Sequence, residues 1–161
     1  MKHSEVIKLY ENLSQVKGLS GAKVNYAVLR NLKNLEVEIE VYKKQEEEIN
    51  DITKEYSSLV ELTYKNISTI NGEVKTKTNE KGQTIYDIHN SKRPELKQIL
   101  DGLALKHKKE IDSANEKWTA LLKFRMENES EFKPITVKVS DLPSDISTEN
   151  MNFLFNIIEP E

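Results

Sequence analysis

Residues 23–64, KVNYAVLRNLKNLEVEIEVYKKQEEEINDITKEYSSLVELTY, decide the fold that the sequence predicts. The stretch contains neither Gly nor Pro, and its apolar residues recur at steps of three and four or at multiples of seven. Such spacing keeps one stripe of a helix facing a partner helix. At about 1.5 Å per residue this helix would be roughly 60 Å long, which exceeds what a compact core covers. A long helical arm is therefore predicted, with a stripe made of Val28, Leu32, Leu35, Ile39, Tyr42, Ile49, Tyr56 and Val60.

A second long helix is predicted to begin near Ser91. Pro94 is tolerated in the first turn of a helix, where the N–H that it lacks has no helical partner in any case. The residues that follow carry another apolar stripe at helical spacing. Its positions are Leu96, Leu100, Leu103, His107, Ile111, Ala114, Trp118 and either Leu121 or Leu122.

The charge pattern favours antiparallel pairing of the two arms, 23–66 and 92–129. Residues 36–62 are net acidic, and residues 63–109 are net basic. Each exposed ion pair contributes only ~0–1 kcal/mol, so the pattern is a guide to direction and not a source of stability. The expected pairs place Lys108 and Lys109 beside Glu46, Glu47 and Glu48.

A β-hairpin is predicted within residues 70–90, between the two arms. Residues 73–78 and 83–88 are rich in β-forming side chains, and residues 79–82 form the connection. A type I turn with Gly82 in the left-handed conformation closes such a hairpin. A two-stranded hairpin is marginal in water, so we expect it to pack on the helix ends or on a partner.

The segments 1–22 and 130–161 are predicted to form a small α/β base. Residues 135–139 alternate like a half-buried strand. The complete expectation is a mainly α fold with a minor β part (α+β): one elongated domain over residues 1–161, with a coiled-coil-like helical hairpin and a β-hairpin at its tip. Predicted helix caps are Ser4, Ser20 and Ser147. The last helix carries Met151, Leu154, Phe155 and Ile158 and is expected to pack on the base with the first helix.

The composition indicates a cytoplasmic protein. The chain has no cysteine, which excludes disulfides and thiolate metal ligands and fits a reducing compartment. It has no apolar run near the ~20 residues that a membrane span needs. The first residues, MKHSEVIKLYENL, lack the apolar block of a signal peptide.

The motifs of catalysis and of cofactor binding are missing from the sequence. His3, His89 and His107 are far apart and lack metal-ligand spacing. Glu46, Glu47 and Glu48 are successive helix positions that point about 100° apart, so they do not converge on one ion. There is no G-x-S-x-G turn and no glycine-rich phosphate loop. We therefore expect a protein without catalytic residues, metal or cofactor.

Several segments resemble a group of phage proteins. They are Val24–Glu36 with its acidic continuation, the region of Tyr56, the turn at 79–82 and Val-Lys-Val-Ser-Asp-Leu-Pro at 137–143. Together they are similar to small uncharacterised helical proteins encoded by tailed phages and prophages of Gram-positive bacteria. The resemblance implies a phage gene and the cytoplasm of a host cell. It transfers no catalytic residue, because the group has no assigned activity.

Binding of a protein partner is the leading functional prediction. Tyrosines are favoured anchors in interfaces, and the basic residues around Tyr86 suit either an acidic protein or the phosphates of a nucleic acid. We expect an inhibitor of a host enzyme or defence complex; the alternatives are a phage assembly or scaffolding factor and a nucleic-acid-binding accessory protein. A second copy of the chain is a further candidate partner. The candidate binding residues are Tyr56, Tyr64, Lys75, Lys77, Lys81, Tyr86, Lys92 and Arg93.

Overall fold

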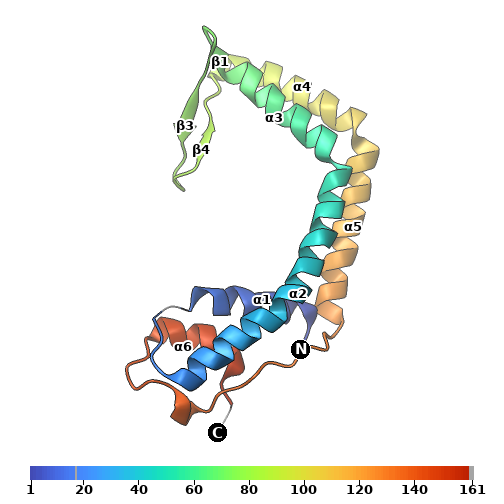
Figure 1. Ribbon diagram of the computed structural model, residues 1–161. Helices are drawn as coiled ribbons and strands as arrows, with labels where there is room; N and C mark the ends of the chain where they lie inside the picture. The colour runs from blue at the N-terminus through green and yellow to red at the C-terminus, as the bar shows by residue number, and fades with distance from the viewer. Residues whose placement is uncertain (17, 160–161) are drawn as a thin grey trace. The chain divides into compact units, whose positions relative to one another are not determined.

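A computed structural model describes residues 1–16 and 18–159 (Figure 1). The chain is mainly helical with two small antiparallel β-hairpins, so the predicted α+β class is confirmed. It divides into two compact units, which we call unit 1 (Met1–Glu46 and Thr119–Glu161) and unit 2 (Glu47–Trp118). The helices are α1 (His3–Gln15), α2 (Ala22–Ile52), α3 (Lys54–Ser68), α4 (Arg93–Lys106), α5 (Lys108–Glu127) and α6 (Thr148–Leu154), with short 3₁₀ turns η1 (Asn90–Lys92), η2 (Val139–Asp141) and η3 (Phe155–Ile157); the strands are β1 (Thr69–Ile70), β2 (Glu73–Val74), β3 (Thr76–Thr78) and β4 (Thr84–Tyr86).

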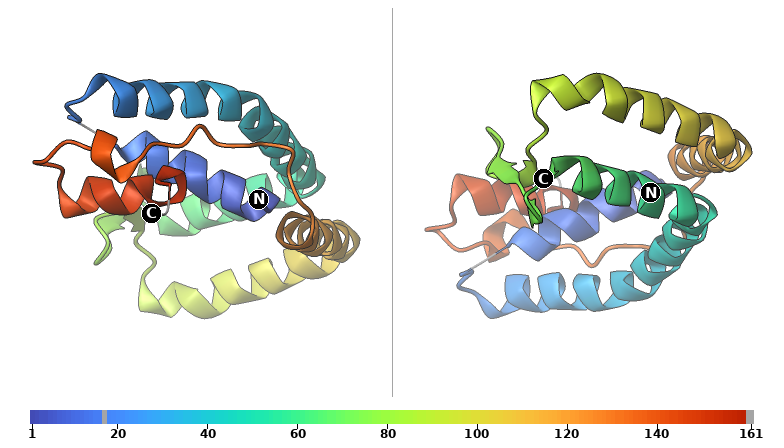
Figure 2. Two further views of the ribbon diagram at one scale, coloured as in Figure 1. Left: turned by 90° about the horizontal axis from the view of Figure 1, so that it is seen from below. Right: turned by 90° about the horizontal axis from the view of Figure 1, so that it is seen from above.

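Within residues 1–16 and 18–159, all large apolar side chains that are fully buried belong to unit 1. α1 packs against α6 (Figure 2), and the inward face of α2 completes the core, as the apolar spacing of both helices predicts. Ile157 is buried and Phe155 is 75% exposed, so the prediction for Phe155 is wrong. The reason is that α6 ends at Leu154 and η3 continues with a tighter turn, which rotates the inward face. The central core residues are Val6, Leu9, Leu13, Val24, Leu35, Leu154 and Ile157.

Two of the three predicted helix caps are wrong. α1 begins at His3, so Ser4 lies inside it, and the backbone N–H of Lys2 donates to the Glu5 carboxylate at 2.7 Å. α2 begins after Gly21, whose carbonyl accepts from the N–H of Asn25, while the Ser20 hydroxyl donates to Asp145. Ser147 does cap α6, since its hydroxyl accepts from the backbone N–H of Asn150 at 3.1 Å.

The predicted strand at 135–139 is reduced to a single bridge. Val137 pairs with the backbone around Ile158, and Val139 already begins η2. The backbone of Ile135 pairs with a side chain: its N–H donates to Asn31 Oδ1 at 2.8 Å, and its carbonyl accepts from Asn31 Nδ2 at 2.9 Å. The predicted alternation ends at Val137, because Val139 is 45% exposed, and the backbone groups of Ile135 and Val137 are satisfied without a sheet.

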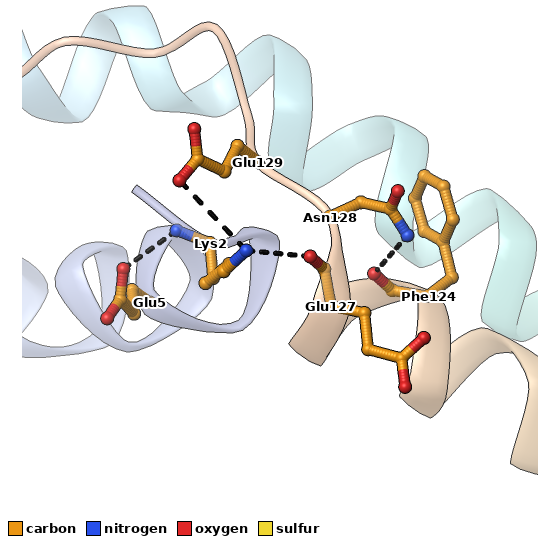
Figure 3. A network of polar contacts seen from close by, with 6 residues as sticks. All are labelled: Lys2, Glu5, Phe124, Glu127, Asn128 and Glu129. Carbon is orange, nitrogen blue, oxygen red and sulfur yellow. Dashed lines mark hydrogen bonds and ion pairs between the residues drawn. The ribbon is translucent and has the colours of Figure 1, made fainter.

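Lys2 joins the start of α1 to the end of α5 (Figure 3). Its Nζ donates to the carbonyl of Glu127 at 2.7 Å, which satisfies an otherwise unpaired carbonyl at the helix terminus. Backbone bonds from His3 N–H to Asn128 and from Ser130 N–H to Met1 extend the contact. The negative end of the α5 dipole also favours this ammonium group.

Glu46, which the charge pattern was expected to place beside Lys108 and Lys109, belongs to unit 1 and has another cationic partner there. Glu46 instead accepts from Arg125 Nη1 at 2.6 Å. Arg125 is buried in unit 1, where its Nη2 donates to the carbonyl of Tyr42 and its guanidinium lies 5.0 Å from the centre of the Tyr42 ring. These charged and dipolar partners offset part of the cost of burying the cation, while its buried Nε has no hydrogen-bond partner among the described residues.

Each predicted arm contains a break within unit 2. α2 and α3 are separated by Thr53, whose N–H and hydroxyl both donate to the carbonyl of Asn50. α4 and α5 are separated by His107, with φ −100° and ψ 21°. Side-chain hydroxyl bonds to nearby carbonyls compete with the helical pattern. The prediction of two uninterrupted helices is therefore wrong.

α3 and α4 pack on each other in antiparallel direction (Figure 1). The Lys92 ammonium at the start of α4 lies 3.5 Å from the carbonyl of Ile67 near the end of α3. At the other end, the rings of Tyr56 and His107 are 5.9 Å apart. His107 is buried, as its place in the apolar stripe predicts.

Two hairpins connect α3 to α4. β3 pairs with β4 in the register Thr76–Tyr86, and Gly82 has φ 75°, which confirms the predicted turn. The predicted strand 73–78 is divided at Lys75, because β2 pairs with β1 instead. Asn71 (φ 51°) and Gly72 (φ 82°) form the tight turn of this additional hairpin, which the Asn-Gly pair in the sequence should have predicted.

Asn31 gives a test of this fold. Asn31→Ala leaves the N–H and the carbonyl of Ile135 without their partner, so we expect the free energy of unfolding to fall by about 2–4 kcal/mol. Chemical denaturation followed by circular dichroism measures the change. The matched control is Asn34→Ala, at an exposed position of the same helix, which should stay within about 0.5 kcal/mol of the parent. Equal losses in both variants would refute this role for Asn31.

Candidate functional site

The candidate site is a groove of about 510 Å³ in unit 2, between α3 and β4. Three of the sequence-predicted binding residues, Tyr56, Tyr64 and Tyr86, line it together. Grooves with aromatic walls and a few polar groups are the usual form of a binding site. The complete lining is Tyr56, Ser57, Val60, Glu61, Tyr64, Thr84, Ile85 and Tyr86.

The helical wall of the groove is a regular pattern on α3. Tyr56, Val60 and Tyr64 follow one another at intervals of four residues, so they stand on one face of the helix. All three side chains are half-buried. Tyr56 is supported by the ring of His107, the residue between α4 and α5. The wall therefore offers apolar ring surface that the rest of unit 2 does not cover.

Tyr86 fixes β4 against this wall. Its ring stacks on Tyr64 with 6.2 Å between centres and 14° between planes, and its hydroxyl donates to Glu61 Oε1 at 2.5 Å. This hydrogen bond is the main reason why the pKa of Tyr86 lies above the ordinary value of 10.0, with burial and the negative charge of Glu61 adding to it. Tyr86 thus packs β4 on α3, and the backbone N–H of Lys75 adds a hydrogen bond to the carbonyl of Ser68 at the end of that helix.

β4 presents an unpaired backbone edge to the groove. The sheet has only two strands, and backbone bonds join Asn79 to Gln83 and Lys75 to Asp87. Because hydrogen-bonded and non-hydrogen-bonded pairs alternate in an antiparallel ladder, the backbone groups of Thr84 and Tyr86 point away from β3. The groove therefore combines aromatic surface with free donors and acceptors on a strand edge.

The predicted basic residues are not brought into the groove. By strand alternation, Lys75 and Lys77 lie on the opposite face of the hairpin from Tyr86, where Lys75 pairs with Glu73 at 2.7 Å and Lys77 with Asp87 at 2.9 Å. Lys81 is exposed at the turn of the β3–β4 hairpin. Lys92 ends η1, and Arg93 begins α4. The single basic cluster around Tyr86 that the sequence predicts is dispersed.

Glu61 is the charged residue of the groove, and the sequence analysis did not find it. It also lines a second hollow of about 740 Å³, together with Lys65, Val74, Thr76 and Tyr86. Its side chain is exposed, and its second carboxylate oxygen has no partner within the described residues. A carboxylate at this position favours a cationic group and disfavours a phosphate.

A polar cluster of His3, Glu38, Tyr42 and Ser130 lies in unit 1, and these side chains hydrogen-bond to one another. The Tyr42 hydroxyl donates to Glu38 at 2.8 Å and lies 2.6 Å from His3 Nδ1, so the imidazole nitrogen is the donor in that contact. The Ser130 hydroxyl bonds to both oxygens of Glu38. Burial, followed by the Glu38 hydrogen bond, raises the pKa of Tyr42. The cluster orders the start of α1 against α2.

The described part of the chain shows neither a metal centre nor a membrane span. No group of three His, Asp or Glu side chains in residues 1–16 and 18–159 is close enough to hold an ion. None of the helices in those ranges combines the length and the apolar content that crossing a bilayer requires.

Comparison with known proteins identifies no relative. No protein-family model matches the chain, and no curated protein and no solved structure matches it either. The resemblance to phage proteins stays a prediction.

The Tyr86–Glu61 contact gives a titration test. Glu61→Ala removes the hydrogen bond and the charge, so we expect the pKa of Tyr86 to fall back toward 10.0. The ¹³Cζ resonance of Tyr86, followed by NMR from pH 8 upward, measures it. Glu55→Ala, on the same helix but outside the groove, should leave the raised pKa unchanged.

The same shift predicts how stability depends on pH. A raised pKa in the folded state means that the folded chain holds the phenol proton more tightly than the unfolded chain. The contribution of Tyr86 to the free energy of unfolding is therefore complete below about pH 10 and is lost as the pH rises through the folded-state pKa. This loss should be weaker in Glu61→Ala; an identical alkaline profile would contradict it.

Proposed function

We propose that this protein is a non-catalytic binding protein whose unit 2 groove takes an extended segment of a protein partner. The observation that carries the proposal is that three tyrosines and the unpaired edge of β4 line one groove. A peptide added to that edge gains main-chain hydrogen bonds, and its alternate side chains reach the neighbouring wall. Tyr56 and Tyr64 form that wall, and Glu61 favours a partner segment with a basic side chain.

The wider setting of the groove follows the sequence analysis. We propose that the arms 23–66 and 92–129 form a long antiparallel, coiled-coil-like pair that carries the hairpins, and that the protein acts in the cytoplasm. The similarity to phage proteins favours a host protein as the partner, as for an inhibitor of a host enzyme or defence complex. An assembly or scaffolding factor is the alternative, and it would use the same groove on a virion protein.

Capture from a lysate tests the proposal. Tagged full-length protein, incubated with lysate of a Gram-positive host with and without phage infection, should retain one dominant protein that mass spectrometry identifies. Tyr64→Ala should weaken that retention by at least about 30-fold, the scale of an aromatic hot spot. Leu105→Ala, at a 76% exposed apolar residue of α4, is the control and should retain the partner fully. Loss of the partner in both variants, or in neither, would refute the groove.

Proline substitution distinguishes strand addition from other modes of binding. Thr84→Pro removes an N–H from the free edge of β4 and leaves the bonds to β3 intact. Thr78→Pro is the matched control, because it makes the same change on the free edge of β3. Titration calorimetry with the captured partner should show a loss of affinity for Thr84→Pro alone.

The rival function, nucleic-acid binding, has a separate test. The ion pairs of Lys75 and Lys77 and the carboxylate in the groove disfavour it, so we expect no electrophoretic shift of single-stranded or duplex DNA or RNA at 50 mM salt. A salt-dependent shift that disappears when Lys75, Lys77, Lys81 and Arg93 are all changed to Glu would establish nucleic acid as the ligand instead.

A further inference from the structure

The outer face of α2 within unit 1 carries an uncovered apolar stripe. Tyr26, Leu29, Val37 and Val41 are 59%, 65%, 68% and 48% exposed. At about 100° per residue they fall on one side of the helix, opposite the buried Leu35. The stripe extends over about 23 Å of helix. Scattered exposed apolar residues are ordinary, but four on one helix face form a surface suited to another helix.

The charges along this stripe change sign at its middle. Arg30 and Lys33 belong to its first half, and Glu36 and Glu40 to its second half. None of these four side chains makes an ion pair within residues 1–16 and 18–159. The face is therefore complementary to itself when it is reversed in direction.

We propose that two copies of this chain associate through the outer faces of their α2 helices in antiparallel direction. With the two-fold axis at the level of residue 35, Leu29 of each copy meets Val41 of the other, and Arg30 meets Glu40. Both contacts occur twice, as a two-fold interface requires. Lys33 and Val37 meet at the centre, where the aliphatic part of the lysine covers the valine.

Self-complementary charge is what selects a second copy as the occupant. A parallel arrangement would place Arg30 against Arg30 and Glu40 against Glu40, which is repulsive. The proposal is independent of the groove, which belongs to unit 2 and shares no residue with this face.

Sedimentation velocity on the full-length chain over a range of concentrations tests the association. We expect a reversible dimer in the parent. Leu29→Asp combined with Val37→Asp should give a monomer with unchanged circular dichroism, because both residues are exposed in the single chain. Leu105→Asp, which places the same charge on the exposed apolar residue of α4, should remain a dimer. A parent that is monomeric at every concentration, or a dimer unaffected by the double change, overturns the proposal.

Charge reversal tests the direction of pairing. Arg30→Glu alone and Glu40→Arg alone should each weaken the dimer about ten-fold, since each creates two repulsive contacts. The chain that carries both changes should recover the parent dissociation constant, because the opposed pairs are then restored with their signs exchanged. Failure of the combined variant to recover would exclude the antiparallel register.

Discussion

The scarcity of apolar side chains is the constraint on which the rest of this structure depends. Only 37% of the residues are hydrophobic, while 32% are charged, so the chain cannot enclose two full cores. Unit 1 receives the fully buried aliphatic residues. In unit 2 the buried positions are few, and they include Ser68 and His107 beside Ile67 and Leu96. Unit 2 therefore packs through half-buried tyrosines, whose hydroxyl groups stay in contact with water or with a carboxylate.

This constraint explains why the groove exists. The ring of Tyr86 stacks on Tyr64, and its hydroxyl donates to Glu61. The remaining ring surface of Tyr56 and Tyr64 on α3 stays uncovered. A two-stranded hairpin has no third strand to cover the edge of β4. A partner that supplies a strand and apolar side chains would complete what the sequence of unit 2 does not provide. Binding and stability would then be coupled, since a ligand that binds only the folded chain stabilises it.

The apolar periodicity predicted much of the fold correctly. Val28, Leu35, Ile39 and Tyr42 are buried as expected. The spacing of apolar residues identifies the helix face that turns toward the core, even when the elements that pack on it are unknown. The helix breaks could not be predicted in this way. Threonine is tolerated in helices, so its presence at position 53 does not by itself predict a break. The hydrogen bonds from Thr53 to the carbonyl of Asn50 replace the regular helical pattern only in the folded structure. The burial of Ile157 in place of Phe155 likewise depends on the change from the α-helix α6 to the 3₁₀ turn η3. The amino-acid composition does not indicate this change.

The candidate site was predicted in part. Tyr56 and Tyr64 share a helix face that the spacing of four residues makes visible, and Tyr86 belongs to a strand that the β-forming run indicates. Glu61 was missed because nothing local separates it from the other carboxylates of α3. Its importance arises from the position of β4, which is a tertiary property. The basic residues were grouped by their nearness in sequence, and strand alternation places them on another face.

The division into units has a consequence for synthesis on the ribosome. Unit 2 is one continuous segment, whereas unit 1 joins residues 1–46 to residues 119–161. The helices α1 and α2 therefore leave the exit tunnel before their packing partners α6 and Ile157 are synthesised. The carbonyl of Glu127, which binds Lys2, is also synthesised later. During translation the apolar faces of α1 and α2 have only each other as cover. Nascent chains of this protein should accordingly be clients of ribosome-associated chaperones until residues 119–161 emerge.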